Sequence, residues 1–473
     1  MVNKVQMPGE TVIDGQAAGE QPSSGGQQHK SPNADRMVET PEEIFERTRA
    51  REVQLSRLLI FFICGGLLFM LLPGTFLGVW NLIAITGRRA AESISPAWLQ
   101  AHGHAQVLGW IGSFILGIGF YSLPKLRGGL KPYEPWTAWA TGIIWMAGVW
   151  LRWLANVYLW QWRALLPISA ALELLAFLIF FRAVSQHKAE EGSKGRLETW
   201  VLVVIAGTLG LMATLLLNLG ACLWLALRGT GPAFPPSFDQ RFLVLAAWGF
   251  MVPFVWGFSA KWLPIFLGAK QPDNRLLAIG VPVHVTAVGL GLAAWFRLTT
   301  VLIVISSSLS IVALRIFARP ERAAKTKGIH ASFPYFVRVA YGWLMVAAVL
   351  GVWAANASNP LGLWGASRHA LTVGFIATMV FCIGQRVLPA FSGMRLLFSP
   401  RLMFAGLLLL LVGCILRVGG EVLAYQEIVP AAWAWLPYSA ILELSAVTVF
   451  AINLILTFMQ PPAPQKPVVV QPT

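Results

Sequence analysis

Twelve long apolar segments constrain this chain more than any other feature of its sequence. A helix that crosses about 30 Å of hydrocarbon needs about 20 predominantly apolar residues, and each segment reaches that length. The apolar runs are continuous and do not alternate with polar residues, which favours helices over the strands of a β-barrel. We therefore predict an all-α polytopic membrane protein. The predicted transmembrane segments lie near residues 58–86, 102–124, 136–160, 164–185, 199–227, 240–267, 274–296, 298–318, 334–357, 366–391, 401–425 and 432–459.

Charge supports this class and indicates the topology. Only 12% of the 473 residues are charged, whereas a soluble protein carries about 25%. The net charge of +15 does not indicate nucleic-acid binding, because the cations lie in short gaps between apolar segments, where they set orientation and contact anionic lipid. We expect the lipid bilayer as a partner and no nucleic acid. Lys and Arg concentrate in the N-terminal flank and in the gaps after the second, fourth and eighth segments, which predicts that both termini are cytoplasmic.

The two ends of the chain differ from its middle. Residues 1–57 are rich in Gly, Gln, Ser and charge, and we expect a disordered cytoplasmic tail followed by a short juxtamembrane helix from about Pro41 to Arg57. Residues 58–459 form the predicted twelve-helix transmembrane domain, and residues 460–473 a flexible C-terminal tail. The four cysteines lie inside apolar segments without CxxC spacing, so we expect them to be small buried apolar groups.

An internal repeat relates the second segment to the tenth. The sequence HGHAQVLGWIGSFILGIGFYSLPKLRG begins at His102, and RHALTVGFIATMVFCIGQRVLPAFSG begins at Arg368. A fainter copy occupies the sixth segment. These coincidences predict three pseudo-repeated four-helix units, residues 58–185, 199–318 and 334–459. One constant offset aligns His104 with His369, Ala105 with Ala370, Gly109 with Gly374, Gly119 with Gly384, Leu123–Pro124 with Leu388–Pro389 and Arg152 with Arg417.

His104 and His369 are the strongest candidate site residues. Ionisable groups inside membrane spans are costly and are functional candidates by default. The repeat places the two imidazoles at matching depth near the outer boundary, on two different helices. Two such histidines can ligate a haem iron axially, and the nearby glycines leave room for a porphyrin. The alternative is that both are hydrogen-bonded residues near helix ends, with the glycines serving helix packing.

Two further histidines are weaker metal candidates. His102 precedes His104 by two residues, about 200° around a helix, so the two face different sides. It could serve a second site such as copper, or meet water at the boundary. His284 lies midway along the seventh segment and could ligate a metal, although a lone buried imidazole is more often hydrogen-bonded to a carbonyl or a serine.

Two arginines lie at matching depths in the repeat. Arg152 and Glu173 flank the turn between the third and fourth segments, and Arg417 and Glu443 flank the corresponding turn in the last unit. An unpaired charge inside the membrane is expensive, which favours two Arg–Glu ion pairs. The rival interpretation is that Arg152 and Arg417 hold haem propionates as bidentate carboxylate partners.

The motifs around His102–His104 and Arg368–His369 resemble those of the NnrS family of bacterial membrane proteins. The resemblance implies twelve spans, haem and copper, and a link to denitrification and nitrosative stress. The arrangement is also similar to subunit I of haem–copper oxidases and nitric oxide reductases, where histidines on helices 2 and 10 hold a low-spin haem. By position, His104 and His369 become candidate ligands of a b-type haem, and His102 a candidate metal residue. The resemblance further implies the bacterial inner membrane.

One departure from the oxidase pattern bears on activity. Those enzymes need three copper-binding histidines on helices 6 and 7 and a further histidine on helix 10, and this chain offers only His284 and His369 there. The leading hypothesis is therefore a haem-binding membrane protein linked to nitric oxide. A respiratory NO or oxygen reductase and a cofactor-free transporter are the alternatives. Whether the protein is an enzyme, and which redox partner it uses, stay open.

Overall fold

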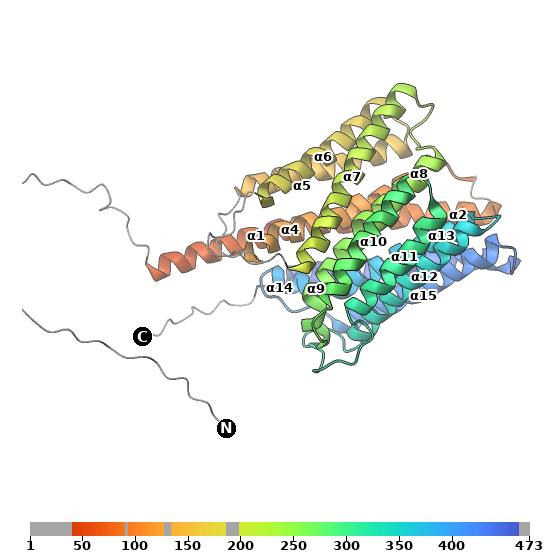
Figure 1. Ribbon diagram of the computed structural model, residues 1–473. Helices are drawn as coiled ribbons and strands as arrows, with labels where there is room; N and C mark the ends of the chain where they lie inside the picture. Colours follow the sequence, from red (N-terminus) through yellow and green to blue (C-terminus); the bar gives the residue numbers. More distant parts are fainter. Residues whose placement is uncertain (1–39, 90–92, 127–133, 186–197, 463–473) are drawn as a thin grey trace, which may run out of the picture. The chain divides into compact units, whose positions relative to one another are not determined.

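The computed structural model describes residues 40–89, 93–126, 134–185 and 198–462. The described part is helical and contains no strand. The chain divides into two compact units, Met1–Arg47 and Thr48–Thr473. The second is a bundle of long helices that run roughly along one common direction (Figure 1). Most of both predicted tails lies outside the described residues.

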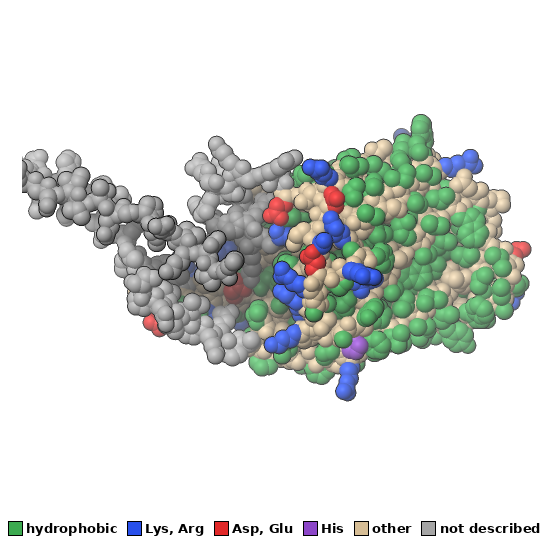
Figure 2. Space-filling model, turned by 60° about the horizontal axis from the view of Figure 1, so that its bottom comes forward, with side chains coloured by type: hydrophobic (Ala, Val, Ile, Leu, Met, Phe, Trp, Pro, Cys, Tyr) green, Lys and Arg blue, Asp and Glu red, His purple; other side chains and the backbone are tan. Residues whose placement is uncertain are grey.

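Eleven helical segments among the described residues are long and apolar enough to cross a membrane, which confirms the multi-pass class. Figure 2 shows a flank covered largely by apolar side chains, with Lys and Arg gathered mainly toward one end. A lipid-facing surface needs this distribution. The segments are Phe45–Arg88, Pro96–Leu123, Trp162–Ser185, Thr199–Arg228, Pro236–Leu267, Asn274–Leu292, Phe296–Ala313, Phe333–Asn356, Gly362–Phe391, Pro400–Tyr425 and Pro430–Met459.

The one predicted segment not among these eleven is the third, near residues 136–160, which corresponds to α5, Pro135–Val157. It is a helix of 23 residues that packs along α6, Trp162–Ser185. Several tryptophans, glycines and threonines and one arginine lower its mean hydropathy, so it is not among the eleven segments above. The described structure therefore establishes eleven candidate spans and leaves α5 as a packed helix of more polar composition.

Three of the long helices form the interior of the bundle. Between 67% and 72% of the most apolar stretch is buried in Pro96–Leu123, Pro236–Leu267 and Gly362–Phe391, against 28–44% in the other eight segments. These are the predicted helices 2, 6 and 10. The first lies beside the third, because the rings of Tyr121 and Phe391 stack with centroids 4.7 Å apart.

Each inner helix contains a π-helical stretch in its first half. The stretches of helices 2 and 10 begin directly after His104 and His369, and the offset of the sequence repeat superimposes their starting residues. The stretch of helix 6 contacts both of the others. Such π-bulges are rare and occur often at functional sites. The segments are α3 (Pro96–His104), η3 (Ala105–Gly112) and α4 (Ser113–Leu126); α8 (Pro236–Leu243), η4 (Val244–Met251) and α9 (Val252–Leu267); α13 (Leu361–His369), η5 (Ala370–Ala377) and α14 (Thr378–Phe391).

The remaining helices surround these three. Helix 1 is continuous from the charged flank into the membrane segment, so the predicted short helix from Pro41 to Arg57 does not end at the boundary. The hairpins α5–α6, α10–α11 and α15–α16 are the most extensively packed helix pairs. The surrounding elements are α1 (Pro41–Phe69), η1 (Met70–Phe76), α2 (Leu77–Arg88), α7 (Thr199–Arg228), α10 (Asn274–Leu292), α11 (Phe296–Ala313), α12 (Phe333–Asn356), α15 (Pro400–Tyr425) and α16 (Leu436–Met459).

Candidate functional site

His102 faces helix 1. Its Nδ1 lies 2.9 Å from the carbonyl oxygen of Gly74, which belongs to η1. The ring also lies against Gly78 of α2, where an added Cβ would come within 2.7 Å of the His102 Cε1 atom. Glycine at this position therefore allows α2 to approach the imidazole closely. With Nδ1 directed at a carbonyl, the hydrogen bond favours the tautomer in which Nε2 keeps its lone pair.

His104 faces the opposite side of helix 2. Its Nε2 lies 2.6 Å from Glu173 Oε1 on α6. The other oxygen of Glu173 accepts a hydrogen bond of 3.2 Å from the Asn218 side-chain amide on α7. Cys222, one turn further along α7, accepts a hydrogen bond from Arg152 Nη1 at 2.8 Å. We call these five residues, all of them buried, the first polar cluster.

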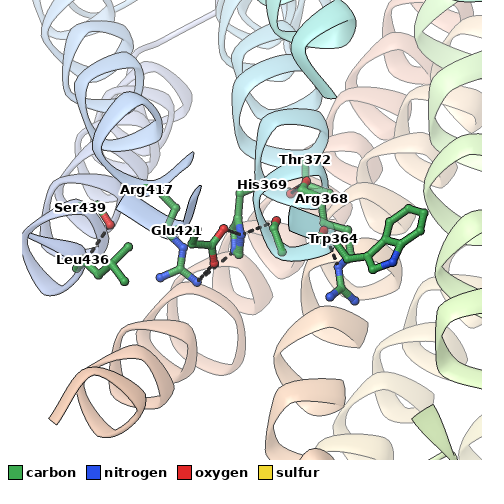
Figure 3. A network of polar contacts seen from close by, with 9 residues as sticks. Trp364, Arg368, His369, Thr372, Arg417, Glu421, Leu436 and Ser439 are labelled. Carbon is green, nitrogen blue, oxygen red and sulfur yellow. Dashed lines mark hydrogen bonds and ion pairs between the residues drawn. The ribbon is translucent and has the colours of Figure 1, made fainter. Parts of the chain in front are cut away.

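His369, Arg417 and Glu421 form a second polar cluster between α13 and α15. Figure 3 shows His369 facing Glu421 and Arg417, whereas Arg368 points to another side of its helix. His369 Nδ1 lies 3.0 Å both from Glu421 Oε2 and from the carbonyl oxygen of Gly365. Arg417 Nη2 lies 3.2 Å from Glu421 Oε1 and 3.3 Å from His369 Nε2. A neutral imidazole with the proton on Nδ1 satisfies all these contacts.

The two clusters separate the histidines that the repeat aligns. His102 interacts electrostatically with His369 and Arg417 of the second cluster, whereas His104 belongs to the first cluster with Glu173. The structure thus brings His102 toward His369 and engages His104 elsewhere. Sequence symmetry points to His104, because the repeat pairs it with His369. Helical geometry directs the two histidines of helix 2 to different neighbours.

The two predicted Arg–Glu ion pairs are not formed among the described residues. Glu173 is already bound to His104 and Asn218, and Arg417 pairs with Glu421, one turn along its own helix. Residues four apart on a helix are close neighbours, so this local pair needs no matching of depth between two helices. Glu443 Oε1 is buried and has no hydrogen-bond partner in the described part of the chain. The prediction of Arg152–Glu173 and Arg417–Glu443 pairs is therefore wrong.

Both predicted cofactor arginines keep donors without a partner. The Nε atoms of Arg152 and Arg417 are buried and make no hydrogen bond to any described residue. Arg152 is only 2% exposed, and its guanidinium lies over the Phe234 ring, 4.7 Å from the centroid. Asp239 of α8 interacts electrostatically with Arg152 and Arg368. A buried guanidinium without a bound carboxylate is costly, so Arg152 is chemically suited to bind an anionic group.

His284 is a buried, hydrogen-bonded histidine, which was one of the two interpretations that the sequence left open. Its Nδ1 lies 3.0 Å from Ser306 Oγ, and its Nε2 lies 2.8 Å from the carbonyl oxygen of Trp248. Both ring nitrogens are thus engaged inside the protein. Within the described ranges, no group of three or more His, Cys, Asp or Glu side chains is placed to hold a metal ion.

Sequence reasoning missed three residues of these clusters. Glu421 is the one acidic residue of the predicted eleventh segment, and it follows Arg417 by four residues, which is the spacing of a helical ion pair. Asn218 gave no signal beyond being a polar residue in an apolar segment. Cys222 was expected to be an apolar group, but its sulfur accepts a hydrogen bond from Arg152.

Comparisons with known proteins agree with this architecture. A family model described as NnrS protein matches residues 60–461. No curated protein matches the chain. A cryo-EM structure described as a haem–copper terminal oxidase dimer is similar, with a TM-score of 0.68, 13% sequence identity, and coverage of 87% of this chain and 85% of that chain. At this identity the likeness establishes the fold.

Proposed function

The chain belongs to the NnrS family, and on that premise we propose that it is a haem-binding integral membrane protein linked to nitric oxide or nitrosative-stress metabolism. A b-type haem lies between helices 2 and 10 in this proposal. The oxidase-like fold supports this placement, because helices 2 and 10 lie side by side in the interior. The rings of Trp110 and Phe381 meet edge to face there, with their centroids 6.4 Å apart.

The orientation of two imidazoles carries the proposal. Metal-ligating histidines nearly always donate their second ring N–H to a carbonyl or a carboxylate, which fixes the ring and its tautomer. His102 meets this condition through the Gly74 carbonyl, and His369 through the Gly365 carbonyl and Glu421. His102 Nε2 makes no hydrogen bond in the described part of the chain, whereas His369 Nε2 accepts one from Arg417 Nη2 at 3.3 Å. We assign His102 and His369 as the two residues that would hold the haem iron.

The sequence-based pairing of His104 with His369 fits less well. His104 Nε2 is held 2.6 Å from Glu173, so binding iron through that atom would cost a buried charge-assisted hydrogen bond. His369 Nε2 faces only the Arg417 guanidinium at 3.3 Å among the described residues. That long side chain can turn away from the ring while it stays bound to Glu421.

The arginines supply charge for the propionates. Arg152 and Arg417 are the proposed partners, because each keeps a buried Nε without an acceptor in the described part of the chain and guanidinium binds carboxylate in a fork geometry. A bound haem would supply a redox-active iron, the chemistry that a link to nitric oxide needs. Glu421 orients His369, and the buried Trp110 and Phe381 rings pack against each other between helices 2 and 10.

Copper, which the family resemblance implies, fits the described residues less well. Both nitrogens of His284 are hydrogen-bonded, and we assign copper no residues.

The finer topology is part of the proposal. With α5 as a twelfth crossing, the helices form three units of four and both termini lie in the cytoplasm of a bacterial inner membrane. The matching π-helices of helices 2, 6 and 10 support the three units. Reporter fusions after α6 and after α15 test this, and we expect a cytoplasmic report from the first and an external one from the second. The reverse result contradicts the topology.

Optical spectroscopy tests the function. Protein purified in detergent from haem-replete cells should show a Soret band and, after reduction, the sharp α band of a six-coordinate low-spin haem. NO consumption with an added electron donor then separates turnover from binding. A purified, folded protein without a Soret band contradicts the proposal and supports the cofactor-free transporter.

A further inference from the structure

A hollow of about 360 Å³ lies at the end of the α10–α11 hairpin, where α10 begins and α11 ends. Its volume falls within the roughly 300–1,000 Å³ of small-molecule sites. Neither polar cluster contributes to it. Two of its lining residues are charged, Asp273 and Arg315. The others are apolar: Leu276, Ile311, Val312, Phe317 and Ala318.

The apolar part of the lining faces outward from the bundle. Val312 is 62% exposed and Phe317 is 59% exposed. Val312 belongs to the span Phe296–Ala313 and Phe317 follows that span by four residues, so both lie near the membrane boundary, where exposed apolar surface can contact lipid. A hydrocarbon chain can therefore enter the hollow laterally from the bilayer.

Asp273 provides a negative charge at a fixed position. Its Oδ1 accepts hydrogen bonds from the backbone N–H groups of Arg275 and Leu276 and so caps α10. Its own N–H donates to the Ala313 carbonyl at 2.8 Å, which fastens the start of α10 to the end of α11. The second carboxylate oxygen makes no hydrogen bond within the described ranges and can accept one from a ligand.

Arg315 provides the opposite charge. It follows α11 with a left-handed φ of 55°, and its Nε is buried without a hydrogen-bond partner among the described residues. In the described structure no ion pair joins Arg315 to Asp273, although both line the same hollow. Two opposite charges that share a hollow without meeting fit a ligand that carries a phosphate for the guanidinium and an ammonium for the carboxylate.

We propose that this hollow binds one phosphatidylethanolamine molecule. Arg315 donates to its phosphate, Asp273 accepts from its primary ammonium, and one acyl chain lies along Leu276, Ile311 and Val312. Phosphatidylcholine has no ammonium N–H to donate to Asp273, and phosphatidylglycerol has no cation there. The chemistry of the two charged residues thus selects the lipid.

Native mass spectrometry of the full chain in detergent, titrated separately with the three lipids, tests the site. We expect one phosphatidylethanolamine to bind at least about tenfold more tightly than either other lipid, as one charge-assisted hydrogen bond implies. Asp273→Asn should lose about tenfold in affinity for this lipid, and it should keep the fold because Asn caps helices as well as Asp. Arg315→Gln should weaken binding of phosphatidylethanolamine and phosphatidylglycerol alike.

Glu321→Gln and Arg319→Gln are the matched controls, because both residues lie in the loop after α11 and do not line the hollow. Both should bind as the unchanged chain does. Equal affinity for all three lipids, or an Asp273→Asn variant that binds phosphatidylethanolamine normally, overturns the proposal. Free phosphoethanolamine that binds as tightly as the lipid overturns it as well, because the acyl chain would then contribute nothing.

Discussion

His369 Nδ1 and Glu421 Oε2 lie 3.0 Å apart and join α13 to α15 inside the bundle. The same carboxylate holds Arg417 at 3.2 Å through its other oxygen. One buried acid therefore orients the proposed haem ligand and neutralises the arginine next to it. This double role makes Glu421 the residue on which the second polar cluster depends most.

Glu421→Gln should destabilise the protein and change the haem. The amide keeps an acceptor for His369 but leaves the largely buried Arg417 without a counter-charge, which costs about 3 kcal/mol. Loss of the negative charge beside His369 should also raise the midpoint potential of the haem, because the oxidised iron carries more positive charge. Chemical unfolding in detergent micelles and redox potentiometry measure the two effects.

The exposed Glu427, just beyond α15, supplies the control. Glu427→Gln removes the same charge without touching His369, and it should leave stability and potential unchanged. If both variants shift the potential equally, a general charge effect explains the result and the positioning role of Glu421 is wrong.

His104 and Glu173 should be strongly coupled. Their contact of 2.6 Å is buried, and a hydrogen bond of this charge-assisted kind contributes about 2 kcal/mol. A double-mutant cycle of His104→Ala and Glu173→Gln should return a coupling energy of that size from unfolding measurements. In the control cycle, His104→Ala with Ser445→Ala on α16, the two effects should add. Additivity in both cycles would show that the contact between His104 and Glu173 contributes nothing to stability.

The apolar segments allowed most of the fold to be predicted. Eleven of the twelve expected spans occur. Their ends are shifted by a few residues, except that the first begins at Phe45, well before the expected residue 58. Hydropathy predicts such spans well, because a helix in the membrane must form all its backbone hydrogen bonds internally. The segment that differs is α5, whose tryptophans and Arg152 face packed neighbours as well as lipid. Its composition reflects tertiary packing, which a hydropathy pattern does not contain.

The site was less predictable, for a geometrical reason. The internal repeat singled out His369, but it identified His104 as the counterpart by position along the chain. The direction in which each imidazole points depends on Glu173 from α6 and on Gly74 and Gly78 from helix 1. These partners come from elements remote in sequence. One of them is a backbone carbonyl, which every residue type has and which the sequence therefore cannot reveal.

Acidic pH should remove a small stabilising contribution from Glu198, which precedes α7 outside the spanning segments. Its hydrogen bond from Lys261 at 3.0 Å, together with one from Trp200, lowers the pKa of this carboxyl below its ordinary value of 4.5. A lowered folded-state pKa stabilises the protein above the unfolded-state pKa, and the contribution is lost as the pH falls through the folded-state pKa.

Because the Glu198 side chain is 64% exposed, the effect is about 0.5 kcal/mol at most. Glu198→Gln should therefore lower Tm by roughly 1 °C at pH 7, and the difference should vanish once the carboxyl is protonated. Thermal unfolding in detergent at a series of pH values measures it. A difference that persists unchanged into acid contradicts the assigned cause.

Gly78→Ala should disturb the haem without removing any polar side chain. The added Cβ would come 2.7 Å from His102 Cε1, so the imidazole or the helix must shift. We expect a loss of low-spin character in the optical spectrum. Gly87→Ala on the same helix is the control, because no described atom lies within 4 Å of its added Cβ. Identical spectra for the two variants would place His102 outside the iron's coordination sphere.

Alanine substitution of each histidine separates the two candidate ligand pairs. His102→Ala and His369→Ala should each open a coordination position on the iron and give a high-spin spectrum or haem loss. His104→Ala should keep the low-spin spectrum and lose only stability, because the His104 Nε2 atom is hydrogen-bonded to Glu173. His284→Ala should keep the spectrum as well, because both its ring nitrogens are hydrogen-bonded within the protein.

If His104→Ala turns the haem high-spin while His102→Ala does not, the pairing from sequence symmetry is correct and the assignment of His102 is wrong. If all four variants keep the low-spin band, the iron is held elsewhere and neither pair survives.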